Sequence, residues 1–307
     1  MNAKNKFGYL AVLPLMLLVT LGLSCEKKIA DGVQRTYYKN GKIEGEYTYK
    51  NGVKQGLFRE FDENGNLISE GLIQGDKVQK TEYSYYYDGG LKSLVTYFDD
   101  KKEGVSKNFY ESGAVHIEAS YKDDMLHGMM KEFAVTGTLL VEKVYSNNKL
   151  NGIYRQYIDG QVHFEKTYGN DKLNGVTKEY SKDGKLMFER TYKNDVLEGV
   201  TKEYAQGKVV HETVYINGQV GIEREFYDDE TVMRENYLEE GKSTKIKEYY
   251  PSGAIMRDLK VQDGRTTEIA EFYENGAVMY RKYYSNGVLI KSEKYDPYGN
   301  FLNTDSM

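Results

Sequence analysis

The chain has 307 residues, of which 39% are hydrophobic and 29% charged, with a formal net charge of -5. This balance suits a soluble protein and argues against binding to nucleic acid or a polybasic contact with a membrane. Because Cys25 is the single cysteine, disulfides, cysteine–zinc sites and cysteine nucleophiles are excluded from the rest of the chain.

Residues 1–24 have the features of a targeting segment. Lys4 and Lys6 precede an apolar run from Phe7 to Leu23, which is short for a membrane span and lacks its usual flanks. We therefore expect a secretory signal peptide, with a retained N-terminal anchor helix as the alternative. Its removal takes two lysines with it, so the net charge of the mature chain changes from -5 to -7.

Cys25 stands where this segment ends, directly after the small residue Ser24. The arrangement resembles the lipobox of bacterial lipoproteins, in which the cysteine becomes the lipidated first residue of the mature protein. The resemblance implies a lipid anchor on Cys25, a short linker over residues 25–31, and a location in the bacterial cell envelope on the outer-membrane or periplasmic side. An ordinary signal peptide with an incidental cysteine is the alternative, and the leaflet is left open.

From residue 32 to about residue 302 the chain repeats itself roughly every 24 residues, and residues 303–307 follow as a tail. A unit this short cannot bury a core alone, so we expect a stacked array of repeats. The units begin at Gly32, Gly56, Lys80, Gly104, Gly128, Gly152, Gly175, Gly199 and Gly221, and two less regular units follow.

Each unit has the pattern of a β-hairpin. In the unit that begins at Gly175, residues 176–180 and 185–192 form two short strands around the turn Asp183-Gly184. The composition agrees, because 30 tyrosines and 11 phenylalanines fit half-buried strand positions. The sequence therefore predicts an all-β protein.

The second strand of each unit carries an aliphatic residue, a glutamate and a tyrosine at spacings of three. In a regular strand the aliphatic residue and the tyrosine share a face and the glutamate points the other way. The sets are Ile43/Glu46/Tyr49, Val115/Glu118/Tyr121, Leu139/Glu142/Tyr145, Val162/Glu165/Tyr168, Leu186/Glu189/Tyr192 and Val209/Glu212/Tyr215.

Stacking the units would set these glutamates in a row, which is unfavourable unless cations lie between them. The first strands supply a recurring cation two residues before an aromatic residue, such as Lys178 before Tyr180. We expect Lys178 to lie on the same face as Glu189, giving a ladder of alternating charge. Each exposed pair would contribute about 0–1 kcal/mol, so its role would be register and solubility.

The repeated motifs GVTKEY at Gly175 and Gly199, YKNG at Tyr38, and KLNG at Lys149 and Lys172 resemble the MORN repeat variant. The resemblance covers nearly the whole mature chain, and bacterial chains of this kind are often described as YwqK-type antitoxins. It implies an elongated, twisted, largely single-layer antiparallel sheet. About 11 hairpins would give roughly 22 strands and a rod on the order of 100 Å long.

No pattern for catalysis, cofactor binding or metal binding emerges. The four histidines, His116, His127, His163 and His211, occupy strand positions or precede a unit glycine, which favours tolerated positions over metal ligation. There is no nucleophile elbow, no phosphate-binding loop and no calcium loop. We therefore expect a chain without enzymatic activity, cofactor or metal.

The leading interpretation is an envelope lipoprotein that offers its repeats to a protein partner. One alternative is an antitoxin or immunity protein that neutralises a toxin, and another is a binder of cell-wall glycan. The candidate binding residues are tyrosines and glutamates from the sets of aliphatic residue, glutamate and tyrosine described above: Tyr121, Tyr145, Tyr168, Tyr192, Tyr215, Glu118, Glu142, Glu165, Glu189 and Glu212.

Overall fold

The computed structural model describes residues 29–306, and within this range it contains strands and turns but no helix. The signal peptide and the lipidation of Cys25 lie outside the described residues and remain predictions. All strands belong to one open antiparallel sheet, in which each strand pairs with its neighbours in sequence. The short β7 and the following β8 both pair with β6, so together they occupy one strand position.

The strands of the described chain are β1 (Gly32–Tyr37), β2 (Ile43–Lys50), β3 (Val53–Phe61), β4 (Leu67–Gln74), β5 (Lys77–Tyr85), β6 (Leu91–Phe98), β7 (Lys101–Lys102), β8 (Gly104–Phe109), β9 (Val115–Lys122), β10 (Met125–Phe133), β11 (Leu139–Ser146), β12 (Lys149–Ile158), β13 (Gln161–Gly169), β14 (Lys172–Tyr180), β15 (Leu186–Lys193), β16 (Val196–Ala205), β17 (Lys208–Ile216), β18 (Gln219–Phe226), β19 (Val232–Glu239), β20 (Lys242–Tyr249), β21 (Ile255–Gln262), β22 (Arg265–Phe272), β23 (Val278–Ser285), β24 (Val288–Tyr295) and β25 (Phe301–Ser306).

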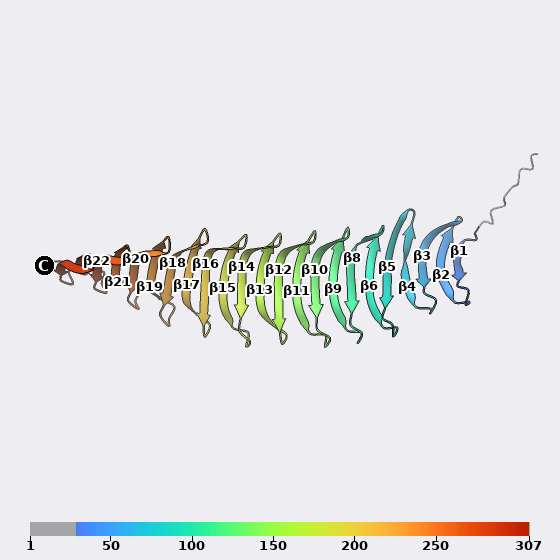
Figure 1. Cartoon of the computed structure of the whole chain (residues 1–307), viewed down its shortest axis with the longest axis horizontal. Coiled ribbons are helices and arrows are strands. Elements are labelled where there is room, and N and C mark those ends of the chain that lie inside the picture. The colour runs from blue at the N-terminus through green and yellow to red at the C-terminus, as the bar shows by residue number, and fades with distance from the viewer. Residues whose placement is uncertain (1–28, 307) are drawn as a thin grey trace, which may run out of the picture.

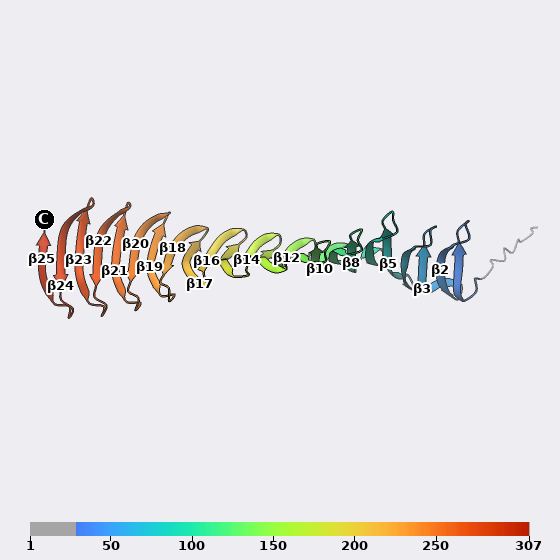
Figure 2. The same cartoon turned by 90° about the horizontal axis from the view of Figure 1, so that it is seen from below.

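The sheet is a long, narrow ribbon with its strands across the long axis (Figure 1). The ribbon twists along its length: the central strands are seen broadside in Figure 1, whereas in Figure 2 they are foreshortened and the C-terminal strands are broadside. This arrangement confirms the all-β array of tandem hairpins in a largely single-layer sheet. The array also reaches further than expected, because residues 303–306, which we expected in a tail, lie in β25 and pair with β24.

The ribbon has no second layer to cover it, and none of the described side chains is less than 2% exposed. The most buried apolar residues are Ala119 at 4% and Phe58 at 7%. Each hairpin therefore depends on the hairpins beside it, as in other repeat arrays. Two sets of side-chain contacts, one at each long edge of the ribbon, connect successive repeats.

One long edge holds two-residue turns that join each hairpin to the next, and we call it the type I′ edge. In the turn between β15 and β16, Asn194 and Asp195 both have positive φ, 50° and 69°. This is the geometry of a type I′ turn, whose twist matches that of the flanking strands. Asparagine, aspartate and glycine fill most of these positions because they tolerate positive φ best, and Glu240 is an exception.

In the central repeats, a residue of each type I′ turn also binds the previous repeat. The backbone N–H of Asp195 donates to the carbonyl of Leu173 at 2.9 Å, and its carboxylate accepts from the N–H of Leu173 at 2.7 Å. We call this pair of bonds the Asx clamp. It recurs at Asp99, Asp124, Asn148 and Asp171. In the C-terminal repeats the second turn residue is glycine, at Gly218, Gly241, Gly264 and Gly287, which has no side chain to form the clamp.

The opposite edge, which we call the loop edge, holds the turns within the hairpins. There, a tyrosine at the start of a turn donates its hydroxyl to a backbone carbonyl of the next repeat. Tyr250, for example, donates to the carbonyl of Phe272 at 2.8 Å. We call this contact the tyrosine lock, and the tyrosines that form it are Tyr38, Tyr86, Tyr110, Tyr227, Tyr250 and Tyr273.

The glycine that begins most units creates a β-bulge near the type I′ edge. Gly175 has a φ of 124°, and Asn174, Gly175 and Val176 together face the single residue Thr167 of β13. A Cβ on Gly175 would lie 3.1 Å from the Cβ of Thr167. Glycine is thus required here by both backbone conformation and close approach.

The third unit begins with Lys80 in place of glycine, and its pairing is different. Strands β4 and β5 pair without any shift of register, with Gly71 opposite Lys80. A lysine does not readily adopt the positive φ that the bulge needs, which explains the regular pairing. This irregularity divides the ribbon into an N-terminal part, β1–β4, and a longer part from β8 onward.

Candidate functional site

One face of the ribbon carries a row of alternating charges, which we call the charge ladder, and the face that bears it the ladder face. Its members are directly opposite one another on successive strands: Lys107, Glu118, Lys131, Glu142, Arg155, Glu165, Lys178, Glu189, Lys202, Glu212, Arg224, Glu235, Lys247 and Asp258. A shorter ladder of Arg35, Glu46, Arg59 and Glu70 occupies β1–β4.

The expected pairing of Lys178 with Glu189 is confirmed. The two residues are directly opposite in the register of β14 and β15, and the lysine Nζ lies 3.9 Å from a carboxylate oxygen. Closer pairs include Arg155 with Glu165 at 2.7 Å. Alternation of sign removes the repulsion that a row of glutamates alone would produce.

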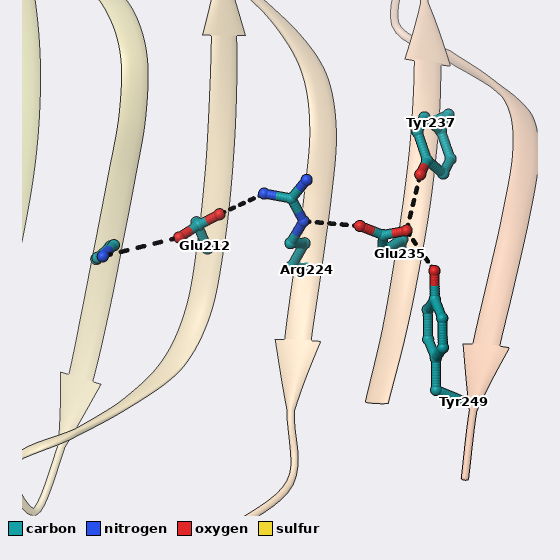
Figure 3. A network of polar contacts seen from close by, with 6 residues as sticks. Glu212, Arg224, Glu235, Tyr237 and Tyr249 are labelled. Atoms are coloured by element: carbon teal, nitrogen blue, oxygen red, sulfur yellow. Dashed lines mark hydrogen bonds and ion pairs between the residues drawn. The ribbon is translucent and has the colours of Figure 1, made fainter. Parts of the chain in front are cut away.

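The ladder is most tightly connected around Arg224, between β17 and β19 (Figure 3). Its guanidinium bridges two carboxylates, with Nη1 2.5 Å from Glu212 and Nε 2.8 Å from Glu235. Glu235 also accepts hydrogen bonds from the hydroxyls of Tyr237 at 2.7 Å and Tyr249 at 2.6 Å. Figure 3 shows these side chains converging on one carboxylate across three strands.

Opposing effects act on the pKa of Glu235. Burial disfavours its charged form, but the hydrogen bonds from Tyr249, Arg224 and Tyr237 outweigh burial and leave the pKa below its ordinary value. For Tyr249, burial and the hydrogen bond to Glu235 both raise the pKa above its ordinary value. Glu235 therefore stays ionised at neutral pH as an acceptor, and the arrangement serves structure.

Beside the charge ladder, toward the type I′ edge, runs a row of exposed aliphatic side chains that we call the aliphatic stripe. One residue per hairpin forms it, two positions before the ladder cation: Val33, Leu57, Val105, Met129, Ile153, Val176 and Val200. Exposure is greatest at Leu57, 71%, and falls to 37% at Val200. In β20, β22 and β24 the corresponding residues are Lys245, Glu268 and Lys291.

The N-terminal end of the stripe borders a hollow of about 450 Å³ on β1–β5, which we call the N-terminal hollow. Val33, Leu57 and Leu72 supply apolar walls, and the short ladder supplies charged ones. The hollow lies where the bulge is missing between β4 and β5. It combines exposed apolar surface with fixed charges, the composition of a site for another molecule.

The candidate residues from the sequence are divided between the two faces. Glu118, Glu142, Glu165, Glu189 and Glu212 belong to the ladder, while Tyr121, Tyr145, Tyr168, Tyr192 and Tyr215 lie on the opposite face, which we call the tyrosine face. Each of these tyrosines stands opposite the glycine that begins a unit; Tyr192, for example, faces Gly175. The tyrosines and the glutamates lie on opposite faces of the sheet, so the two sets do not form one site.

The prediction that the aliphatic residue of each set shares a face with the tyrosine is wrong. Val162 pairs directly with Tyr157, and the hydroxyl of Tyr157 donates to Glu142 of the ladder at 2.7 Å. Tyr157 and Val162 therefore lie on the ladder face, apart from Tyr168. The reason is an extra residue, His163, at a bulge near the loop edge, which reverses the alternation of faces.

The same pairing gives a third row on the ladder face, the aromatic–aliphatic row at the loop edge. Its pairs in the central repeats include Phe133 with Leu139, Tyr157 with Val162, Tyr180 with Leu186, Tyr204 with Val209 and Phe226 with Val232. Sequence reasoning identified these residues but put the aliphatic members on the wrong face. The available signal in the sequence was that the second strand of each hairpin has one residue more than the first strand over this stretch, which indicates a bulge.

The histidines make local contacts. His163 Nδ1 lies 2.7 Å from the carbonyl of Tyr180, the contact that a tyrosine lock makes elsewhere, and the ring of His116 lies 4.3 Å from that of Tyr110. Within residues 29–306 we find no group of three or more side chains suited to hold a metal ion. In the same range no helix has the length and apolar character to cross a membrane.

Four segments of the chain match the model of the MORN repeat variant: residues 30–51, 54–74, 102–123 and 173–194. They coincide with hairpins of the ribbon. A search of the curated proteins finds no match for this chain.

Several solved structures are similar to this chain, with low sequence identity and low TM-scores. They include a mutant of S. aureus TarM in complex with fondaparinux, alpha-GlcNAc-glycerol and UDP (12% identity, 30% of this chain and 19% of that chain, TM-score 0.26), TcdB2-TccC3 (11%, 88% and 21%, 0.19), and the Photorhabdus luminescens Tc holotoxin pore (14%, 90% and 16%, 0.24). This chain spans about a fifth or less of their length. Similarity this low indicates neither a shared fold nor a shared function.

Proposed function

We propose that this chain, which carries MORN repeat variants, is a non-enzymatic scaffold of the bacterial cell envelope that binds a protein partner at the N-terminal hollow. The observation that carries the proposal is the coincidence of the hollow with the most exposed part of the aliphatic stripe, Val33 and Leu57. Exposed apolar surface rimmed by charge is typical of protein contacts.

The charges around the hollow favour a protein partner with both signs of charge. Arg35 lies 2.6 Å from Glu46, and Arg59 lies 3.3 Å from Glu70, so cations and anions alternate along its wall. Arg59 is 59% exposed and leaves donors free for a partner's carboxylates. Such charges supply orientation and specificity, and the apolar stripe supplies affinity.

A lipid anchor on Cys25 is the second part of the proposal. Strand β1 begins at Gly32, so the intervening residues span at most about 25 Å when fully extended. An anchored chain would hold the N-terminal hollow near the membrane surface, where envelope proteins are concentrated. The far end of the ribbon would remain free.

Capture from envelope extracts tests the binding site. The full chain, extracted in mild detergent, is compared with Leu57→Lys and Val33→Lys, which place a charge in the hollow. Val288→Lys is the matched control, because Val288 has the same exposure as Val33, 61%, and lies on β24. We expect one envelope protein to be retained by the wild type and the control and lost from the two hollow variants. Equal retention by all four chains would contradict the proposed site.

The anchor is tested separately by Cys25→Ser. We expect this variant to leave the membrane fraction while its strand content, measured by circular dichroism, stays unchanged. Membrane fractionation equal to that of the wild type would exclude lipidation as the means of attachment.

A further inference from the structure

The charge ladder has a symmetry that the fold itself does not require. It has fourteen members in unbroken alternation, from the cation Lys107 to the anion Asp258. Reversing the order of such a ladder places every cation opposite an anion. The midpoint lies between Lys178 and Glu189, on β14 and β15. A second copy turned about a two-fold axis along the strands at this midpoint would therefore match the ladder throughout.

The same operation also matches the two rows beside the ladder. The axis exchanges even-numbered and odd-numbered strands, which carry different residue types in each row. In the aromatic–aliphatic row, Tyr180 of one copy would lie over Leu186 of the other, and Tyr157 over Val209. Each aromatic ring would thus meet an aliphatic side chain, a favourable pairing across packed sheets.

The aliphatic stripe is complementary to itself in size as well. Its large residues, on the even-numbered strands, alternate with smaller ones on the odd-numbered strands, since Val176 pairs with Thr191 and Ile153 with Thr167 within one chain. After rotation, Val176 would lie over Thr191 of the other copy, and Ile153 over Val214. Large side chains then meet smaller ones, as interdigitated packing requires.

We propose that the ladder face over β11–β18 is the interface between two copies of this chain, related by that two-fold axis. Beyond this span the match ends, because Met129 would meet Tyr237, and Val105 would meet Lys260. Eight strands measure about 38 Å along the ribbon, and the three rows about 20 Å across. The resulting area of about 800 Å² per copy is that of a stable protein interface.

Charge selects this antiparallel arrangement of the two ribbons over the parallel one. Two copies facing each other with their ribbons in the same direction would place Lys178 over Lys178 and Glu189 over Glu189. Like charges in contact across an interface exclude such arrangements. The sheets would pack in the aligned manner of a β-sandwich, about 10 Å apart. The N-terminal hollow on β1–β5 lies outside the paired span, so this interface is independent of the proposed partner site.

Mass in solution is the first test. Sedimentation of the full chain in density-matched detergent should give twice the chain mass, and Ile153→Lys and Val176→Lys should each weaken the dimer tenfold or more. Val210→Lys is the matched control, because Val210 is 40% exposed, as is Ile153, but lies off the stripe as the extra residue of the loop-edge bulge in β17. A monomeric wild type, or equal loss of dimer in the control, would overturn the proposal.

Cross-linking then tests the orientation. In a Cys25→Ser background, chains carrying Val176→Cys are mixed with chains carrying Thr191→Cys and oxidised. The two-fold axis predicts mixed disulfide dimers in several-fold excess over dimers of either variant alone. A mixture of Val210→Cys and Thr191→Cys chains should give only background. Mixed dimers no more abundant than this background would contradict the axis, even if the wild type were dimeric.

Discussion

The central repeats, over residues 115–205, and the C-terminal repeats, over residues 219–306, have the same hairpin fold but are joined by opposite edges. Asx clamps at the type I′ edge join central repeats, with Asp195 bound to Leu173. Tyrosine locks at the loop edge join C-terminal repeats, with Tyr250 bound to Phe272. Either edge can therefore supply the side-chain contacts between successive repeats, and the ribbon around Tyr110 and Asp124 has contacts at both edges.

The ladder face differs between the two regions as well. The central repeats expose aliphatic residues beside the ladder, such as Ile153, whereas the C-terminal repeats place Lys245, Glu268 and Lys291 at the same positions. Charged side chains on an open sheet oppose unwanted association. The C-terminal repeats are thus suited to solvent, and the central repeats to a partner surface.

Loss of a bulge glycine in the central repeats should have the largest effect. Gly175→Ala combines an unfavourable positive φ with a Cβ close to Thr167, so we expect a loss of about 3 kcal/mol in local stability. Gly264→Ala is the C-terminal control: its φ is also positive, but it has open space around it, and about 1 kcal/mol is expected. Hydrogen exchange of the affected hairpin measures both, and equal losses would refute the role of the contact with Thr167.

The carboxylate of Glu235 should give the C-terminal repeats an acid-sensitive stability. Its folded pKa is lowered, so its contribution is present above the unfolded pKa and is lost as the pH falls through the lowered folded value. Glu235→Gln should cost about 2 kcal/mol at neutral pH, because bonds to a charged acceptor are lost. It should also make the free energy of unfolding of hairpin β18–β19 depend less on pH in the acidic range. An unchanged pH dependence in this range would mean that other carboxylates dominate.

Removal of one Asx clamp should loosen a central repeat by a smaller amount. Asp195→Ala leaves the N–H of Leu173 without its acceptor, and we expect a loss of about 1.5 kcal/mol. Asp195→Asn keeps an acceptor oxygen and serves as the control, with little change expected. Faster hydrogen exchange at the Leu173 amide in the alanine variant is the measurement. Identical rates in both variants would show that the clamp does not stabilise the repeat.

Loss of one tyrosine lock should have the smallest effect. Tyr250→Phe removes the hydroxyl that binds the carbonyl of Phe272, and about 1 kcal/mol of local stability should be lost. Tyr298→Phe is the control, because Tyr298 is 90% exposed at a turn. Thermal unfolding followed at the C-terminal repeats should separate the two variants. A loss no larger than that of Tyr298→Phe would show that the tyrosine lock does not stabilise the repeat.

The sequence predicted the hairpin period, the single sheet and the pairing of Lys178 with Glu189, because turns and alternating strands are local patterns. It did not predict the face of Val162, since one extra residue, His163, reverses the alternation. It also missed the regular pairing at Lys80 and the tyrosine locks. Tyr250 and Phe272 are 22 residues apart, and only the register of the assembled sheet brings them together.

Because the ribbon twists along its length (Figures 1 and 2), the number of hairpins determines the relative orientation of its two ends as well as its length. Inserting one hairpin would move every later repeat outward by about 10 Å and would also turn it around the long axis. Two surface patches on such a rod are therefore separated by a distance along the long axis and by an angle around it. Both are set by the number of hairpins between the patches. Gain or loss of a single repeat would rotate one end of the molecule relative to the other without changing the residues of any patch.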